Sequence, residues 1–200
     1  MDLFRAVPSS AVARGSVPQG RQDSVRLPSN LPFFIDNLLE MWRPSTMPSR
    51  RHAVYASPTP ELALANASSG AEGEGYVAMR LVITGEAKVA QLQVTDARYH
   101  GDIRRLTRVV QQHSEFLTSL DRAAKAEHFG PLFIPGTSKA EMFDWFQAAQ
   151  TKGIPELTEF ADELMKACTF WRDAVAEPVD APGELFFELM PGAEYVLMPL

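Results

Sequence analysis

The period of the apolar residues changes twice along this chain, and that change limits the folds open to it. Short apolar runs with β-type alternation lie near both ends, whereas apolar residues in the middle recur at three and four residues, as on one face of a helix. Strands grouped apart from helices are typical of α+β proteins. We therefore expect an α+β fold with a split mixed or antiparallel sheet, built from N- and C-terminal strands, and a helical insert over residues 101–177.

The strand predictions rest on short β-branched and aromatic runs that turn residues separate. They cover residues 3–7, 53–57, 76–83, 88–94, 184–188 and 195–198. Between the last two runs, residues 190–193 contain a Pro-Gly pair, which favours a hairpin turn.

Helical spacing, caps and breakers predict the helices. One is expected over residues 34–42 and a short one after Thr59-Pro60-Glu61. In the insert, an apolar stripe over 103–120 predicts a long helix that Gly130 and Pro131 break. Ser138 and Glu141 form a capping box for a second helix, which stops at Gly153. A third helix is expected from Pro155 as far as Val175.

The chain has the size of one domain. Its 200 residues, 46% hydrophobic and 22% charged, suit a single folded core, so we expect one domain over residues 1–200. Residues 8–29 are rich in proline, glycine, serine and arginine, which predicts a long flexible loop.

The net charge, the single cysteine and the lack of targeting signals limit the partners and the cell compartment that we expect. A net charge of −6 argues against a general nucleic-acid-binding protein. The single cysteine, Cys168, lies on the apolar stripe of the third predicted helix, which favours a buried structural thiol over a nucleophile. The first residues lack the pattern of an export signal and no apolar run is long enough for a membrane helix, so we expect a cytoplasmic protein.

Several common kinds of site lack their sequence signals. There is no glycine-rich phosphate loop and no Gly-x-Ser-x-Gly elbow. The four histidines do not share a helix face at metal-binding spacing, so we expect no metal cofactor.

The densest polar cluster precedes the strand predicted over residues 53–57. Arg50 and Arg51 lead into it, and Tyr55 and Ser57 lie at its end. An arginine at a cleft can bind two phosphate oxygens at once, while a tyrosine can stack on a bound base and a serine can hydrogen-bond a base or ribose. The alternative is that the arginines are solvated and that Tyr55 and Ser57 only pack.

Charged residues in the terminal strands are further candidates. Arg5 lies within an apolar strand, where it pairs, faces a cavity or points to solvent. Glu184 opens a predicted strand, Glu188 follows on the same face and Glu194 opens the last strand. A strand carboxylate can stabilise a cationic ribose C1′, but it can also be an edge charge that prevents aggregation.

These segments together resemble the ADP-ribosyltransferase superfamily, including its RES-domain branch. Leu3-Phe4-Arg5-Ala6 is similar to the first strand of that family, which bears an NAD-contacting arginine. The segment from Val54 to Ala63 is similar to the second strand, which ends in an aromatic and a small hydroxyl residue before a helix. The strands at 184–187 and 195–198 resemble the pair that begins with the catalytic glutamate. Glu184 and Glu188 are too far apart to form the Glu-x-Glu motif of the arginine-specific transferases.

The resemblance implies an NAD-dependent mono-ADP-ribosyltransferase that modifies a protein or another macromolecule, in the manner of a toxin or effector, or an enzyme that hydrolyses NAD. It implies that NAD is the substrate, that Glu184 and Ser57 are catalytic, and that NAD contacts are made by Arg5, Arg50, Arg51 and Tyr55. An RNA 2′-phosphotransferase shares this fold and would use His52 beside the arginines, although the negative charge disfavours RNA.

A non-catalytic alternative is a protein-binding inhibitor or adaptor that acts through its acidic surface. In that case an exposed apolar patch should contain Phe143, Phe146 and Trp171.

Overall fold

The computed structural model describes residues 2–12, 17–21, 23–27, 31–67, 75–179 and 181–200. They form two compact units, each described by itself. The β unit comprises Met1–Arg26, Pro44–Ala97 and Asp173–Leu200, and the helical unit comprises Leu27–Arg43 and Arg98–Arg172.

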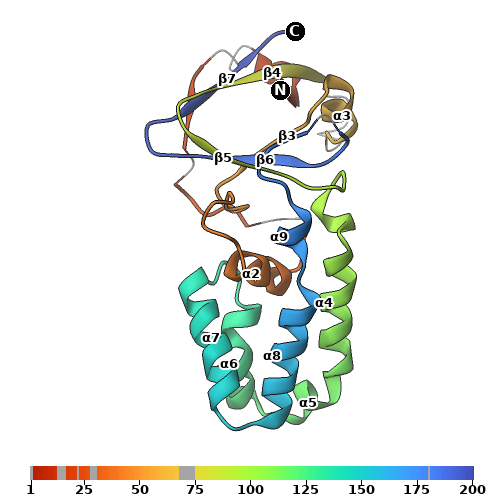
Figure 1. Cartoon of the computed structure of the whole chain (residues 1–200), viewed down its shortest axis with the longest axis vertical. Helices are drawn as coiled ribbons and strands as arrows, with labels where there is room; N and C mark the ends of the chain where they lie inside the picture. The colour runs from red at the N-terminus through yellow and green to blue at the C-terminus, as the bar shows by residue number, and fades with distance from the viewer. Residues whose placement is uncertain (1, 13–16, 22, 28–30, 68–74, 180) are drawn as a thin grey trace. The chain divides into compact units, whose positions relative to one another are not determined.

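The β unit contains two antiparallel sheets, so the predicted α+β class and split sheet are confirmed (Figure 1). Sheet A has the order β1-β4-β7-β2, with β1 at Leu3–Pro8, β4 at Tyr76–Thr84, β7 at Glu194–Met198 and β2 at Gln19–Gly20. Sheet B has the order β3-β6-β5, with β3 at Val54–Ala56, β6 at Leu185–Leu189 and β5 at Ala87–Gln91. The first and last strands thus both border β4, although they are far apart in sequence.

The predicted hairpin between the last two strands is wrong. Strand β6 pairs with β3 and β5, whereas β7 pairs with β4 and β2, so the turn at residues 190–193 carries the chain from one sheet to the other. The turn after β4 does the same, and the two turns are joined where the Met190 N–H donates to the Glu86 carbonyl at 2.9 Å. A turn sequence specifies a reversal of the chain, but the partner of each strand depends on burial across both sheets.

Apolar side chains fill the space between the two sheets. Val7, Met79, Leu81, Tyr195 and Leu197 come from sheet A, and Val54, Ala56, Leu185, Phe187 and Leu189 come from sheet B. Because side chains alternate along a strand, the other residues of sheet B point away from this core.

The β unit also includes short helical segments and part of the predicted loop. Helix α3 at Pro60–Ala65 begins as predicted, with Thr59 capping it and proline in its first turn. Of the predicted loop over residues 8–29, Ser9–Ala11 form a 3₁₀ turn, η1, and Gln19–Gly20 form β2, whereas residues 13–16, 22 and 28–29 lie outside the described residues. A second 3₁₀ turn, η2, lies at Ala97–Tyr99.

The helical unit packs α8 (Pro155–Ala167) against α4 (Gly101–Gln112) and α7 (Lys139–Thr151). Helix α2 (Phe33–Met41) contacts both α6 (Arg122–Phe133) and α7 (Figure 1). Short helices α5 (Ser114–Ser119) and α9 (Phe170–Asp173) follow α4 and α8. The predicted capping box of Ser138 and Glu141 is present at the start of α7.

Two predicted helix boundaries are wrong. Gly130 and Pro131 lie inside α6, close to its end at Phe133, and the long predicted stripe is broken earlier, at the ends of α4 and α5. The third predicted helix ends before Cys168, where the backbone becomes extended, and Val175 instead pairs with Gln91 beside sheet B. The apolar spacing continues across this break and hides it.

A buried carboxylate joins the start of α4 to the start of α9. Asp102 is fully buried, and its Oδ2 accepts the backbone N–H groups of Thr169 and Phe170 at 2.7 and 2.8 Å. Arg105 also donates to Asp102. Asp102 therefore caps α9 from a different helix.

Candidate active site

Strand β6 divides its residues between two faces of sheet B. Leu185, Phe187 and Leu189 point into the core between the sheets. By alternation, Glu184, Phe186 and Glu188 lie on the opposite face, where Tyr55 is the cross-strand partner of Phe186. We call these four residues the polar face of sheet B.

A row of three residues crosses the polar face at its Glu184 end. Phe4 and Ser57 exchange two backbone hydrogen bonds, at 2.9 and 2.8 Å, between β1 and the end of β3. The pairing of β3 with β6 ends at Ala56 and Leu185. Alternation from the Tyr55–Phe186 pair directs Ser57 and Glu184 to the same face of sheet B, and Phe4, opposite Ser57, shares that face.

Arg50 forms an ion pair with Glu184 out of contact with bulk water. Its Nη1 lies 3.2 Å from Glu184 Oε2, and the two side chains are only 3% and 13% exposed. The backbone N–H of Ala97 donates to the same carboxylate oxygen at 3.0 Å. Two donors therefore fix the orientation of the Glu184 carboxylate.

Burial raises the pKa of Glu184 above its ordinary value. The Arg50 guanidinium opposes this rise, while the negative charge of Asp96 adds to it. The carboxylate is therefore closer to protonation near neutral pH than an exposed glutamate.

Tyr55 lies among two cations and another ring. Its ring is 5.9 Å from that of Phe186, centroid to centroid, and the guanidinium carbons of Arg26 and Arg50 are 5.0 and 5.5 Å from the Tyr55 centroid. Burial raises the pKa of the Tyr55 hydroxyl, and Arg50 opposes the rise. Tyr55 thus presents an aromatic ring where positive charge already gathers.

The other candidate glutamates differ from Glu184 in their surroundings. Glu188 is buried and accepts the Ser49 backbone N–H at 2.8 Å and an Arg21 Nη2 donor at 3.4 Å. Glu194 is exposed and lies on β7 of sheet A. Of the three, Glu184 is the one that pairs with Arg50.

The remaining predicted site residues are less closely grouped. Arg51 is buried, and its carbonyl accepts the Arg26 backbone N–H at 2.9 Å. Arg5 pairs with Met79 in the ladder between β1 and β4, and alternation directs it to the face of β1 opposite Phe4. The structure therefore brings Arg50, Tyr55, Ser57 and Glu184 together, and Arg5 lies on the other side of its strand.

Two contributors to this site were missed in the sequence. Arg26 lies in the predicted loop, and Ala97 contributes only its backbone N–H. Neither has a local pattern, because both reach the site through contacts between distant segments.

An open hollow of about 570 Å³ borders the row at Phe4. Its walls are formed by Asp2, Phe4, Pro58, Thr59, Pro60, Glu61 and Pro178. Since Pro58 follows Ser57 directly, this hollow offers space for a ligand beside the polar face.

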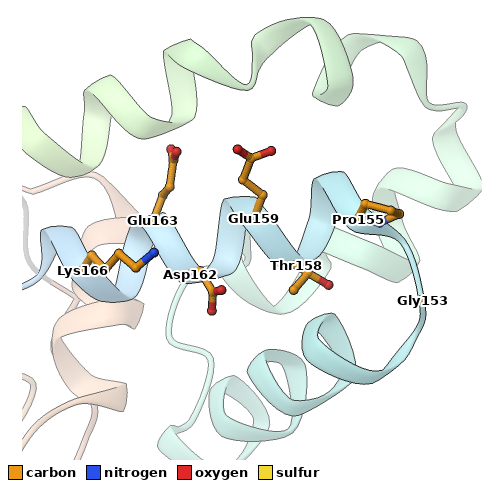
Figure 2. Close-up of a pocket in the computed structure, with 7 residues that line it drawn as sticks. All are labelled: Gly153, Pro155, Thr158, Glu159, Asp162, Glu163 and Lys166. Carbon is orange, nitrogen blue, oxygen red and sulfur yellow. The ribbon is translucent and has the colours of Figure 1, made fainter.

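A second open hollow, of about 550 Å³, lies along α8 in the helical unit. Figure 2 shows that Glu159 and Glu163 extend to one side of α8, whereas Thr158 and Asp162 extend to the other. Glu163 pairs with His113 at 3.0 Å and Asp162 accepts from Gln150 at 2.9 Å. The acidic groups of this hollow diverge, and two of them pair with side chains of neighbouring helices.

The residues expected to form an apolar patch do not share one environment. Phe143 is 54% exposed, whereas Trp171 is buried and its indole N–H donates to the Leu39 carbonyl at 2.7 Å. Phe146 is partly buried against Trp42. Trp171 is a core residue of the helical unit.

Further groups outside the polar face also have defined settings. Burial raises the pKa of Cys168 to about 12, which favours the thiol over the reactive thiolate. Within the described ranges, no three His, Cys, Asp or Glu side chains are grouped to hold a metal ion. No helix in the described part of the chain is long and apolar enough to cross a membrane.

Comparison of the chain with models of protein families, with curated proteins and with solved structures gives no match. The functional interpretation therefore depends on the geometry of the polar face.

Proposed function

We propose that this protein is an NAD-dependent mono-ADP-ribosyltransferase that modifies a macromolecule or, with water as acceptor, hydrolyses NAD. The observation that supports it is the grouping of an arginine-bound carboxylate, Glu184, with Tyr55 and Ser57 on the same face of sheet B. The likeness of these strands to the ADP-ribosyltransferase superfamily supports the same reaction.

The reaction breaks the bond between ribose C1′ and the nicotinamide nitrogen. The bonding electron pair leaves with nicotinamide, which becomes neutral, and positive charge develops on the ribose. The Glu184 carboxylate stabilises that charge, and the acceptor then bonds to C1′ and loses a proton. Tyr55 and Ser57 position the nicotinamide and its ribose.

Arg50 has a different role in this proposal from the pyrophosphate contact that the sequence suggested. Its guanidinium is directed at Glu184 and is almost fully buried. It therefore holds the carboxylate in one orientation and favours its ionised form, which is the form that stabilises the ribose cation. Arg50 is a positioning residue.

The test measures nicotinamide release and transfer of labelled ADP-ribose, with and without cell lysate. We expect wild-type protein to consume NAD and Glu184→Gln to be slower by about 10²–10³-fold, the loss typical when one electrostatic contact to the transition state is removed. Glu194→Gln changes an exposed carboxylate on sheet A and serves as the matched control.

Thermal unfolding of each variant shows that a loss of rate is not a loss of fold. The proposal is overturned if folded wild-type protein neither releases nicotinamide nor transfers ADP-ribose under any of these conditions. It is also overturned if Glu184→Gln retains the full rate of the wild type.

A further inference from the structure

Residues on either side of position 22 contact the β unit near the polar face. Gln19 and Gly20 pair with β7, and Arg21 then reaches Glu188 at 3.4 Å. Further along, the backbone N–H of Arg26 donates to the Arg51 carbonyl at 2.9 Å. These contacts hold the Arg26 side chain beside Tyr55.

The positively charged guanidinium of Arg26 lies over the Tyr55 ring. Its guanidinium carbon lies 5.0 Å from the ring centroid. A guanidinium is flat and positively charged, so its place on the ring suits another flat cation of similar size.

The two arginines on this ring differ in how easily they can leave it. Arg50 is 3% exposed at its side chain and is paired with Glu184, so moving it would leave a buried charge alone. Arg26 is exposed, so water can solvate its guanidinium once it moves. An exposed cation–π contact is worth about 0.5–1 kcal/mol, which corresponds to a two- to fivefold change in affinity.

We propose that Tyr55 is a binding site for a flat cationic ring and that Arg26 sets its affinity by occupying the same place. With regard to the ligand, this rests on the proposed function, because the nicotinamide ring of NAD is a pyridinium cation. Arg26 is then a specificity-determining residue that a bound pyridinium displaces.

The experiment uses two small probes and measures binding, which needs no turnover. 1-Methylnicotinamide carries the pyridinium charge, and nicotinamide is its neutral counterpart. Titrations followed by ligand-observed NMR are expected to show that Arg26→Ala binds the cation about two- to fivefold more tightly than wild type. The neutral ring is expected to gain less, and Tyr55→Leu is expected to lose the preference for the cation.

Arg98→Ala is the matched control, because Arg98 is also an exposed arginine over a tyrosine, 4.8 Å from the centroid of the Tyr99 ring. It should leave both affinities unchanged. Equal or weaker binding of the cation by folded Arg26→Ala overturns the inference, as does the absence of binding to every variant.

The outcomes separate this inference from the proposed reaction. Tighter binding of 1-methylnicotinamide by Arg26→Ala, in a protein that consumes no NAD, supports the cation site and removes the reaction. If the protein consumes NAD but Arg26→Ala does not change the affinity for 1-methylnicotinamide, the reaction is supported and the role of Arg26 is overturned.

Discussion

Glu184 and Arg50 hold opposite charges away from water, so each depends on the other for its charged form. The Ala97 backbone N–H is a second donor, beside Arg50, that fixes the orientation of the Glu184 carboxylate. Burial nevertheless has the larger effect on Glu184, since its pKa is raised despite the neighbouring guanidinium. At the scale of the residue, the site therefore combines a fixed orientation with a carboxylate whose pKa lies above that of an exposed glutamate.

This raised pKa predicts how stability depends on pH. The folded protein binds the Glu184 proton more tightly than the unfolded chain does, so the resulting stabilisation is complete below the ordinary pKa of 4.5 and is lost as the pH rises through the folded-state pKa. Glu184→Gln stays neutral throughout. We expect the free energy of unfolding of wild type, minus that of Glu184→Gln, to fall with rising pH by at most about 1.4 kcal/mol per unit.

Urea unfolding at a series of pH values, followed by tryptophan fluorescence, measures this difference. A difference that stays constant or increases with pH would contradict the assignment of a raised pKa to Glu184.

At the scale of the element, single polar side chains cap the first turns of helices in this protein. Asp102 caps α9 through two backbone N–H groups, although α9 begins 68 residues later in the chain. Asp121 caps α6 locally, with one hydrogen bond to the Ala124 N–H at 2.8 Å. The first cap is buried and the second is exposed, so their contributions to stability should differ.

We expect Asp102→Ala to lower the free energy of unfolding by about 3 kcal/mol, because it leaves buried N–H groups without their acceptor. Asp121→Ala should cost about 1 kcal/mol, as is usual for an exposed helix cap. Chemical denaturation of the two variants tests the comparison, and equal losses would show that Asp102 is not the stronger cap.

At the scale of the whole molecule, the β unit depends on a corner where the chain passes between its sheets twice. Gly85 has a φ of +95°, and a Cβ at this position would lie 2.9 Å from the Cβ of Ala193. Ala193 follows β6 and precedes β7, so the two crossings touch at this glycine.

Gly85→Ala should therefore destabilise the protein by about 2–4 kcal/mol, because it adds a steric clash to an unfavourable backbone angle. Gly153→Ala is the control, since Gly153 also has a positive φ, of +71°, but open space around its Cβ position. It should cost only about 1–2 kcal/mol. Thermal unfolding measures both, and losses of equal size would mean that the contact at Ala193 has no effect.

Patterns that act within a few residues predicted much of the fold. Alternation located β1, β3, β4 and β6, and the capping box at Ser138 located α7, because these signals depend on the local backbone. Apolar spacing failed at Cys168, because the same spacing continues through the break at the end of α8.

The sequence alone determined that strands form at both ends and helices between them, and it marked Arg50, Tyr55, Ser57 and Glu184 as candidates. Only the tertiary structure decided that β6 and β7 enter different sheets, that Arg50 pairs with Glu184 and that Arg26 covers Tyr55. The physical reason is the distance along the chain over which each signal acts. Local periodicity fixes which face of a strand is apolar, whereas strand partners and the contacts of a loop depend on burial across the whole β unit.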